Sequence, residues 1–242
     1  MNEKQRAPRR SYLLPAGLIL AVVLVGFART FYLRGAFFSE ALPSYLILHG
    51  TALTAWFVIF FIQVILVAKR RVDVHKRLGI VGAVLVPIII ITSLITVAVP
   101  AAPIIDQNPY AGIGNISAVL GFGILVGYGI RYRRKPALHR RLMLLSSIQI
   151  TGPAIDRIAQ IPSVNRFLEP ILPDALGPTQ IAFAILGTMA LLAMLFISDI
   201  RSRGRPHAAT VLGTVCIFLL GPALGAVFIF SGAWAFFVQL VT

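Results

Sequence analysis

Long apolar stretches alternate with short polar loops along almost the whole chain. A helix crosses the roughly 30 Å hydrocarbon core of a bilayer in about 20 residues, and seven stretches reach that length. We expect membrane-spanning helices near residues 12–33, 43–68, 78–99, 112–130, 138–158, 179–200 and 208–230. The pattern therefore predicts an all-α fold, with one transmembrane helical domain over residues 12–242 behind a basic tail, residues 1–11.

Composition supports a membrane protein. Only 12% of the 242 residues are charged and 58% are hydrophobic, whereas a soluble domain carries about 25% charged residues. In a soluble protein the net charge of +14 would suggest a nucleic-acid partner. We expect no such partner here, because the cations are confined to short loops. We expect these loops to meet the anionic headgroups of membrane lipids.

The distribution of cations predicts the orientation. Eighteen of the 22 Lys and Arg residues lie in the amino-terminal tail and in every second loop, within residues 4–10, 69–77, 131–141 and 201–205. Because Lys and Arg accumulate on the cytoplasmic side, we expect a bacterial inner-membrane protein with its amino terminus in the cytoplasm and its carboxyl terminus outside. For the last 35 residues we expect one span kinked near Gly221 and Pro222, followed by an aromatic tail in the outer interface. An eighth half-span is the alternative.

Two basic loops carry the same motif. The segment Arg71-Val-Asp-Val-His75-Lys-Arg-Leu matches Lys135-Pro-Ala-Leu-His139-Arg-Arg-Leu, and a shorter copy ends at His207. We therefore expect one leading helix followed by three hairpins in a parallel repeat. The histidines have two interpretations: they meet phosphate headgroups, or His75 and His139 bind a haem b. We expect no cofactor and no metal ion, and the single cysteine, Cys216, cannot form a disulfide or a CxxC site within the chain.

Polar residues recur on one side of two apolar stretches. In the second, His49, Trp56 and Gln63 follow one another at intervals of seven residues. In the fifth, a polar stripe covers a sector of about 100°: His139, Ser146, Gln149, Pro153, Asp156 and Arg157. We expect Gln63, Ser146 and Gln149 to face the interior of the bundle. We also expect Pro153 to kink its helix beside a polar pocket, because proline has no N–H for the carbonyl of Gln149.

Four ionisable residues are expected at a similar height. Counting 1.5 Å per residue from the cytoplasmic edge places Arg29, His49 and Asp156, with its neighbour Arg157, roughly 25–28 Å up. Ionisable groups at such depth are costly unless they are paired, so we expect Asp156 to pair with one of the other three. This outer cluster is our candidate ligand site. Alternatively, it lies in the outer interface and only holds three helices together.

Three segments carry a family resemblance. "GFARTFYLR", "LHGTALTAWFVIFFIQVILVAKRRVDVHKRLG" and "LHRRLMLL", within residues 26–158, resemble an uncharacterised family of bacterial polytopic membrane proteins, a domain of unknown function. The resemblance implies an integral membrane protein and no particular reaction. A fainter similarity to cytochrome b561-like bundles would imply two haems. Such haems need paired histidines at both faces, and here only His49 lies at the outer one.

Three classes of function follow. The sequence contains no Walker loop, GxSxG or HExxH motif, so we predict no catalytic residue. We expect a protein that binds a small or lipidic ligand within the helix bundle. The alternatives are a membrane haem or redox protein and a non-catalytic assembly or scaffold protein. A Soret band in the purified protein would distinguish the haem class from the other two.

Overall fold

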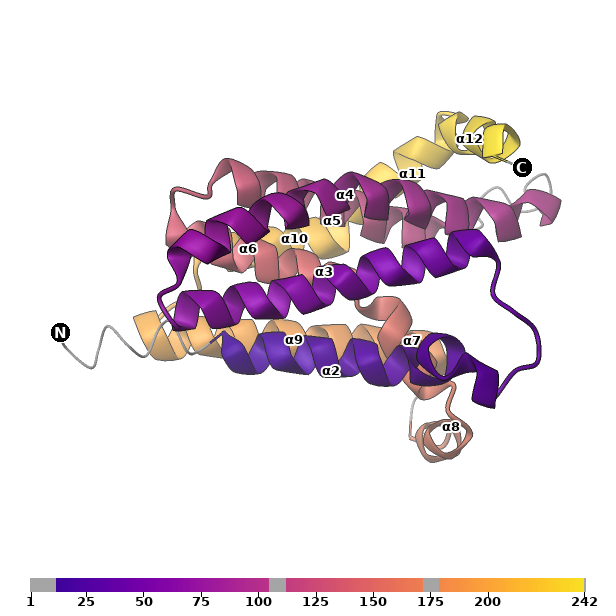
Figure 1. Cartoon of the computed structure of the whole chain (residues 1–242), viewed down its shortest axis with the longest axis horizontal. Helices are drawn as coiled ribbons and strands as arrows, with labels where there is room; N and C mark the ends of the chain where they lie inside the picture. Colours follow the sequence, from indigo (N-terminus) through magenta and orange to yellow (C-terminus); the bar gives the residue numbers. More distant parts are fainter. Residues whose placement is uncertain (1–11, 105–111, 172–178, 242) are drawn as a thin grey trace. The chain divides into compact units, whose positions relative to one another are not determined.

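The computed structural model of the chain describes residues 12–104, 112–171 and 179–241, and these are mainly helical (Figure 1). Helix accounts for 86% of the structure, and no strand occurs among the described residues. The expected all-α fold is therefore confirmed. The basic tail, residues 1–11, and the acidic residues Asp106 and Asp174 lie outside the described ranges.

Six helical stretches in the described part of the chain are long and apolar enough to cross a membrane. They are Leu13–Tyr32, Ser44–Ala68, Val72–Ala101, Ile113–Arg131, Ile181–Arg203 and Ala208–Phe230. Each overlaps one of the expected spans. Together they support the expected multi-pass membrane protein.

The first four stretches follow the hydrophobic pattern closely. Their elements are α2 (Leu13–Phe27), the π-helical turn η2 (Ala28–Tyr32), the short η3 (Arg34–Ala36), α3 (Ser44–Ala68), α4 (Val72–Ala101), η4 (Ala102–Ile104) and α5 (Ile113–Arg131). Helix α4 begins six residues before the expected span, so His75 lies in its first turn. The charged residues of this turn do not interrupt the helix, because Lys and Arg are good helix formers.

The fifth expected span is interrupted. Helix α6 (Pro136–Gln149) ends two residues before α7 (Gly152–Ala159) begins. The short helix α8 (Pro162–Leu168) follows. Pro153 explains the break, because it cannot donate to the carbonyl of Gln149 and its ring crowds the preceding turn. The helix is thus interrupted close to the expected kink at Pro153, and residues 138–158 are not among the six long apolar stretches.

The carboxyl-terminal part consists of two long helical stretches and a short helix. It contains α9 (Thr179–Arg203), α10 (Ala208–Val215), the π-helical turn η6 (Cys216–Leu220), α11 (Gly221–Phe230) and α12 (Ala233–Val241). In η6 the N–H of Gly221 donates to the carbonyl of Cys216, five residues earlier. This wider turn comes directly before Pro222, which has no N–H to continue the α-helical ladder. Gly232 has a φ of 77° and separates α12 from α11. The nine described residues of α12 extend about 14 Å, and the alternative of an eighth half-span stays a prediction.

The chain folds into two compact units. The first contains Met1–Ala41, Thr54–Ile80 and Ile150–His207, and the second contains Leu42–Leu53, Val81–Gln149 and Ala208–Thr242. Helices α3 and α4 contribute to both. The break between α6 and α7 coincides with the passage of the chain from the second unit to the first.

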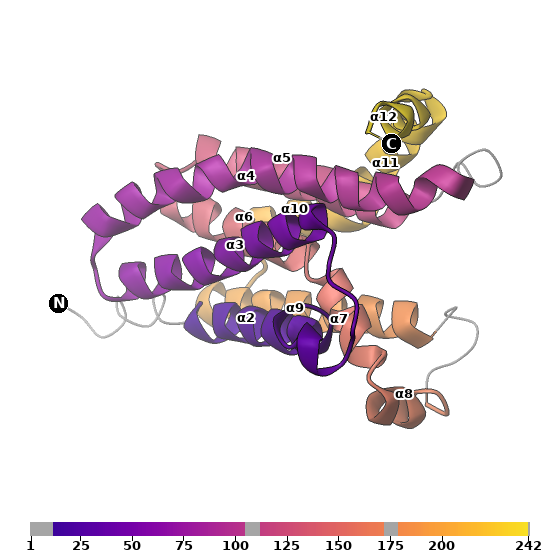
Figure 2. The same ribbon diagram turned by 45° about the vertical axis from the view of Figure 1, so that its right-hand side comes forward.

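In the first unit, α2 packs against α7 and α9. Helices α2 and α9 lie side by side in both ribbon views (Figures 1 and 2). Gly26 of α2 permits the contact with α7, since a Cβ at this position would overlap the backbone carbonyl of Ala154. A side chain here would therefore force the two helices apart.

In the second unit, α5 packs against α6 and α11. Gly225 of α11 allows this close approach, because a Cβ at this position would overlap the Ser117 hydroxyl of α5. A separate apolar cluster gathers around Trp234 of α12, whose side chain is 1% exposed. Its buried partners include Ala98 of α4 and Ile116 of α5. This cluster anchors the carboxyl-terminal helix to the second unit.

Candidate functional site

The first unit contains an open apolar groove. It has a volume of about 240 Å³ and is lined by residues of three helices: Leu18 and Val22 of α2, Ile155 and Ile158 of α7, and five residues of α9 between Phe183 and Met194. We call it the α2–α7–α9 groove. Gly187 and Ala190 contribute little side-chain bulk on the α9 side. All nine lining residues are apolar, so the groove suits a hydrocarbon chain.

Arg157 is a cation close in sequence to two residues that line this groove. It lies on α7 between the lining residues Ile155 and Ile158, and its Nη1 donates to the carbonyl of Pro153 at 3.0 Å. Its guanidinium rests over the ring of Phe27, 4.8 Å from the centroid. Phe27 is five residues beyond Val22, about 8 Å farther along α2. The hydrogen bond and the aromatic contact hold the cation beside the last residue of α2.

Arg29 lies two residues farther on, in the π-helical turn η2. Its guanidinium stands 5.5 Å from the ring centroid of Phe37 and 5.7 Å from that of Phe38. A hydrogen bond of 2.9 Å between the hydroxyls of Tyr32 and Thr54 ties the same turn to α3. Cations over aromatic faces are favoured by about 0.5–1 kcal/mol at exposed sites. Arg29 therefore adds a second positive charge to this end of the unit.

Asp156 interacts with two neighbours on its own segment, Gln160 and Arg157. Its Oδ2 accepts a hydrogen bond of 2.7 Å from Nε2 of Gln160, one turn farther along the chain. Its negative charge also acts on the adjacent Arg157. Both Arg157 and Arg29 contact aromatic rings, as described above. Any part that Asp156 plays in binding a ligand stays a prediction.

His49 belongs to the second unit, where it contacts α4. Its Nδ1 lies 3.2 Å from Oγ1 of Thr92, and this hydroxyl donates its proton to the carbonyl of Ile88 at 2.7 Å. Because a hydroxyl has a single proton, we assign the hydrogen of the first bond to Nδ1 of His49. The expected cooperation of His49 with Arg29, Asp156 and Arg157 stays a prediction.

The three expected interior polar residues take part in helix contacts. Gln63 of α3 donates from Nε2 to the carbonyl of His75 at 3.1 Å. Ser146 of α6 is fully buried, and its hydroxyl donates to the carbonyl of Met143 at 2.8 Å. Gln149 is 9% exposed, and its Nε2 lies 3.5 Å from the carbonyl oxygen of Ser117. Gly121 of α5 makes room for this amide.

His75 and His139 occupy equivalent local positions. Each is the fourth residue of its helix, and its backbone N–H donates to the residue four positions earlier, Arg71 or Lys135. Nδ1 of His139 also lies 2.8 Å from the carbonyl oxygen of Gly129, near the end of α5. Terminal helix carbonyls need such donors, so His139 fastens the α5–α6 hairpin. The haem role of both histidines stays a prediction. No group of three or more His, Cys, Asp and Glu side chains suited to a metal ion occurs among the described residues.

Two buried charged residues were not singled out from the sequence. Asp199 of α9 is 0% exposed, and its Oδ2 accepts the backbone N–H of His207 at 3.1 Å. Arg141 of α6 is 1% exposed and donates to the carbonyl of Ala137 at 2.7 Å. Asp199 could have been noticed as the one acidic residue in its apolar stretch. Arg141 could not, because it stands among many cations of a basic loop.

No family model, curated protein or solved structure matches this chain. The resemblance to an uncharacterised membrane family therefore stays an expectation. The argument for function rests on the groove and its cations.

Proposed function

We propose that this protein binds an anionic membrane lipid, with one acyl chain in the α2–α7–α9 groove. The observation that supports this most directly is a groove of about 240 Å³ whose lining residues are all apolar, on a chain with six candidate membrane spans. Ligand sites in proteins are concave and mostly apolar, with a few polar groups that fix orientation. An acyl chain can fill this groove without placing any polar group of the ligand against its apolar lining.

The charge near the groove selects the headgroup. Arg157 packs against the ring of Phe27, the last residue of α2, and Arg29 follows two residues later. Guanidinium groups bind phosphate oxygens through several N–H donors. We therefore propose a headgroup with net negative charge, such as phosphatidylglycerol, in preference to phosphatidylcholine. Asp156 accepts a hydrogen bond from Gln160 and its charge also acts on Arg157, so the phosphate would share this guanidinium with the carboxylate.

The orientation of the chain decides which leaflet supplies this lipid. We propose seven crossings with the amino terminus in the cytoplasm, in which α6, the break at Ile150 and Thr151, and α7 together form the fifth crossing. Discontinuous helices of this kind occur in membrane proteins where the broken backbone is covered by protein. The matching positions of His75 and His139 support a repeated hairpin. Arg157 then faces the outer leaflet.

Cysteine labelling tests this orientation. Single cysteines at Asp73 and Lys135, introduced with Cys216→Ala, should react with a membrane-impermeant maleimide only after the cytoplasmic face is opened. Cysteines at Glu40 and Ser163 should react in intact cells, because the positive-inside rule places their loops outside. All four positions are exposed. Labelling of Lys135→Cys and Ser163→Cys from the same side would contradict the fifth crossing.

Thermal unfolding in detergent tests the lipid site. Adding phosphatidylglycerol to the delipidated protein should raise the Tm more than phosphatidylcholine does, because only the lipid that binds the folded state stabilises it. A ligand at 100 times its Kd contributes about 2.7 kcal/mol. Ala190→Leu, which fills the groove, and Arg157→Gln, which removes the cation, should each reduce this difference. Ala190 lines the groove and is exposed, so the added bulk enters open space.

The matched control is Ala193→Leu on the same helix. Ala193 is also exposed but does not line the groove, so this variant should retain the full response to phosphatidylglycerol. The proposal fails if both leucine variants respond like the parent. It also fails if the two lipids stabilise the parent equally.

A further inference from the structure

A second hollow lies in the second unit, at the end of α5 that leads into a basic loop. It is open, has a volume of about 240 Å³ and is lined by Ile124, Gly127, Tyr128 and Arg131. Gly127 and Tyr128 lie three and four residues after Ile124, and Arg131 lies one further turn along, so all four share one face of the helix. The hollow exists because Gly127 has no side chain, and a Cβ at this position would meet nothing within 4 Å.

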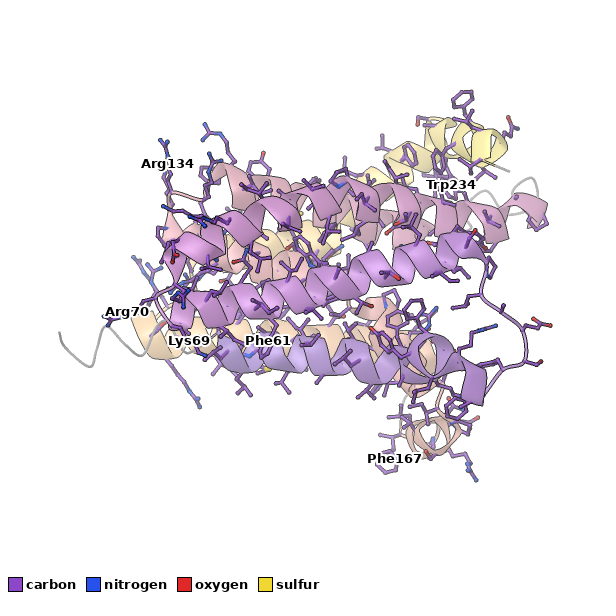
Figure 3. All side chains as sticks on the ribbon, viewed as in Figure 1. Phe61, Lys69, Arg70, Arg134, Phe167 and Trp234 are labelled. Atoms are coloured by element: carbon purple, nitrogen blue, oxygen red, sulfur yellow. The ribbon has the colours of Figure 1, made fainter. Side chains whose placement is uncertain are left out.

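Cations and two stacked tyrosines lie beside the hollow, at the carboxyl-terminal end of α5. Tyr128 and Tyr132 stack with their ring centroids 6.2 Å apart and their planes at 12°. Arg131 and Lys135 place their charged groups over the Tyr132 ring, at 5.9 and 5.6 Å from its centroid. The loop also carries Arg134, labelled in Figure 3, and the loop residues from 133 to 135 are exposed. Positive charge is thus concentrated just beyond the hollow.

The two features occur in the order in which a phospholipid presents its parts. From Arg131 to Ile124 the helix descends seven residues, or about 10 Å, from a cationic end to an apolar one. Tyrosine is favoured at the headgroup level of a membrane, where its ring is apolar and its hydroxyl is wet. Basic pockets on the cytoplasmic side of membrane helices bind anionic headgroups.

We propose that this notch binds an anionic phospholipid, with its phosphate at Arg131 and Lys135 and an acyl chain against Gly127. The site is separate from the α2–α7–α9 groove and shares no residue with it. Only the choice of leaflet rests on the orientation proposed above, and that orientation places this lipid in the cytoplasmic leaflet. The hollow distinguishes this site from general attraction to a basic loop, because it requires a shape as well as a charge.

Native mass spectrometry can count the lipids that remain bound. The protein released from phosphatidylglycerol nanodiscs should carry one fewer phosphatidylglycerol in Gly127→Leu than in the parent, and likewise in Arg131→Gln. The control is Gly114→Leu, at the other end of α5, where an added Cβ also meets nothing within 4 Å. It makes the same change of residue type on the same helix and should retain the lipid. Phosphatidylcholine nanodiscs should not yield this adduct.

Each other outcome contradicts the notch. If Gly127→Leu keeps the adduct while Arg131→Gln loses it, the loop attracts lipid by charge alone. If the parent retains only the mass of inorganic phosphate, or retains phosphatidylcholine equally, the site does not recognise an anionic lipid. Ala190→Leu separates the two proposals, because it should remove the groove lipid and leave the notch lipid in place.

Discussion

Replacing Trp234 by alanine is expected to lower the free energy of unfolding by about 3–5 kcal/mol, the usual cost of truncating a large buried aromatic residue. Trp234 is 1% exposed and stacks on Phe237 with their centroids 6.0 Å apart. Its ring also comes within 6.4 Å of Phe228, measured between centroids. Truncation should therefore leave a cavity among α4, α5 and α12 and release the carboxyl-terminal helix.

The measurement is urea or thermal unfolding in detergent, with limited proteolysis of the last residues as a second readout. Phe236→Ala on the same helix is the control, because the Phe236 side chain is 69% exposed. It should change the stability by less than about 1 kcal/mol. Equal effects of the two variants would show that α12 does not depend on Trp234 for its position.

The second large effect is expected at Gly26. Gly26→Ala should destabilise the first unit by about 1–3 kcal/mol or more, in the range of overpacked cores. The new Cβ would overlap the backbone carbonyl of Ala154, and a backbone group cannot rotate away as a side chain can. Helices α2 and α7 must then separate, which also disturbs the groove between them.

Gly17→Ala on the same helix provides the comparison. A Cβ at Gly17 meets only the Phe61 ring, at an ordinary 3.5 Å, and alanine favours helix over glycine by about 1 kcal/mol. Gly17→Ala should therefore melt at or slightly above the temperature of the parent. A Gly26→Ala variant that melts like the parent would mean that α2 and α7 do not touch at this point.

Helix positions could be predicted from the sequence because burial in lipid requires about 20 apolar residues in succession. The break at Ile150 and Thr151 was only partly predictable. Pro153 marks it, but a proline bends some helices and ends others; Pro87 lies inside the continuous α4. Neighbouring helices that replace the lost hydrogen bonds decide between these outcomes, and such neighbours cannot be deduced from local sequence.

In the candidate site, too, only some of the residues could be predicted from the sequence. Arg29 and Arg157 could be selected because charged residues are rare in apolar stretches. The groove could not, since Leu18, Ile155 and Gly187 resemble dozens of other apolar residues in the chain. Only the crossing of α2, α7 and α9 brings them together. The hydrogen bond from Gln160 to Asp156 was also not anticipated, because helical height alone does not show which side chains meet.

The most direct test of the lipid-binding groove is to map where a lipid chain lies. Phosphatidylglycerol with a diazirine near the middle of one acyl chain would be activated by light in membranes that contain the protein, and the labelled peptides would be identified by mass spectrometry. We predict that label is enriched on α9 between Phe183 and Met194 and on α2 between Leu18 and Val22, and that Ala190→Leu removes this enrichment. Label on these segments no higher than on the exposed Leu212 and Leu219, or label unchanged in Ala190→Leu, would contradict the account.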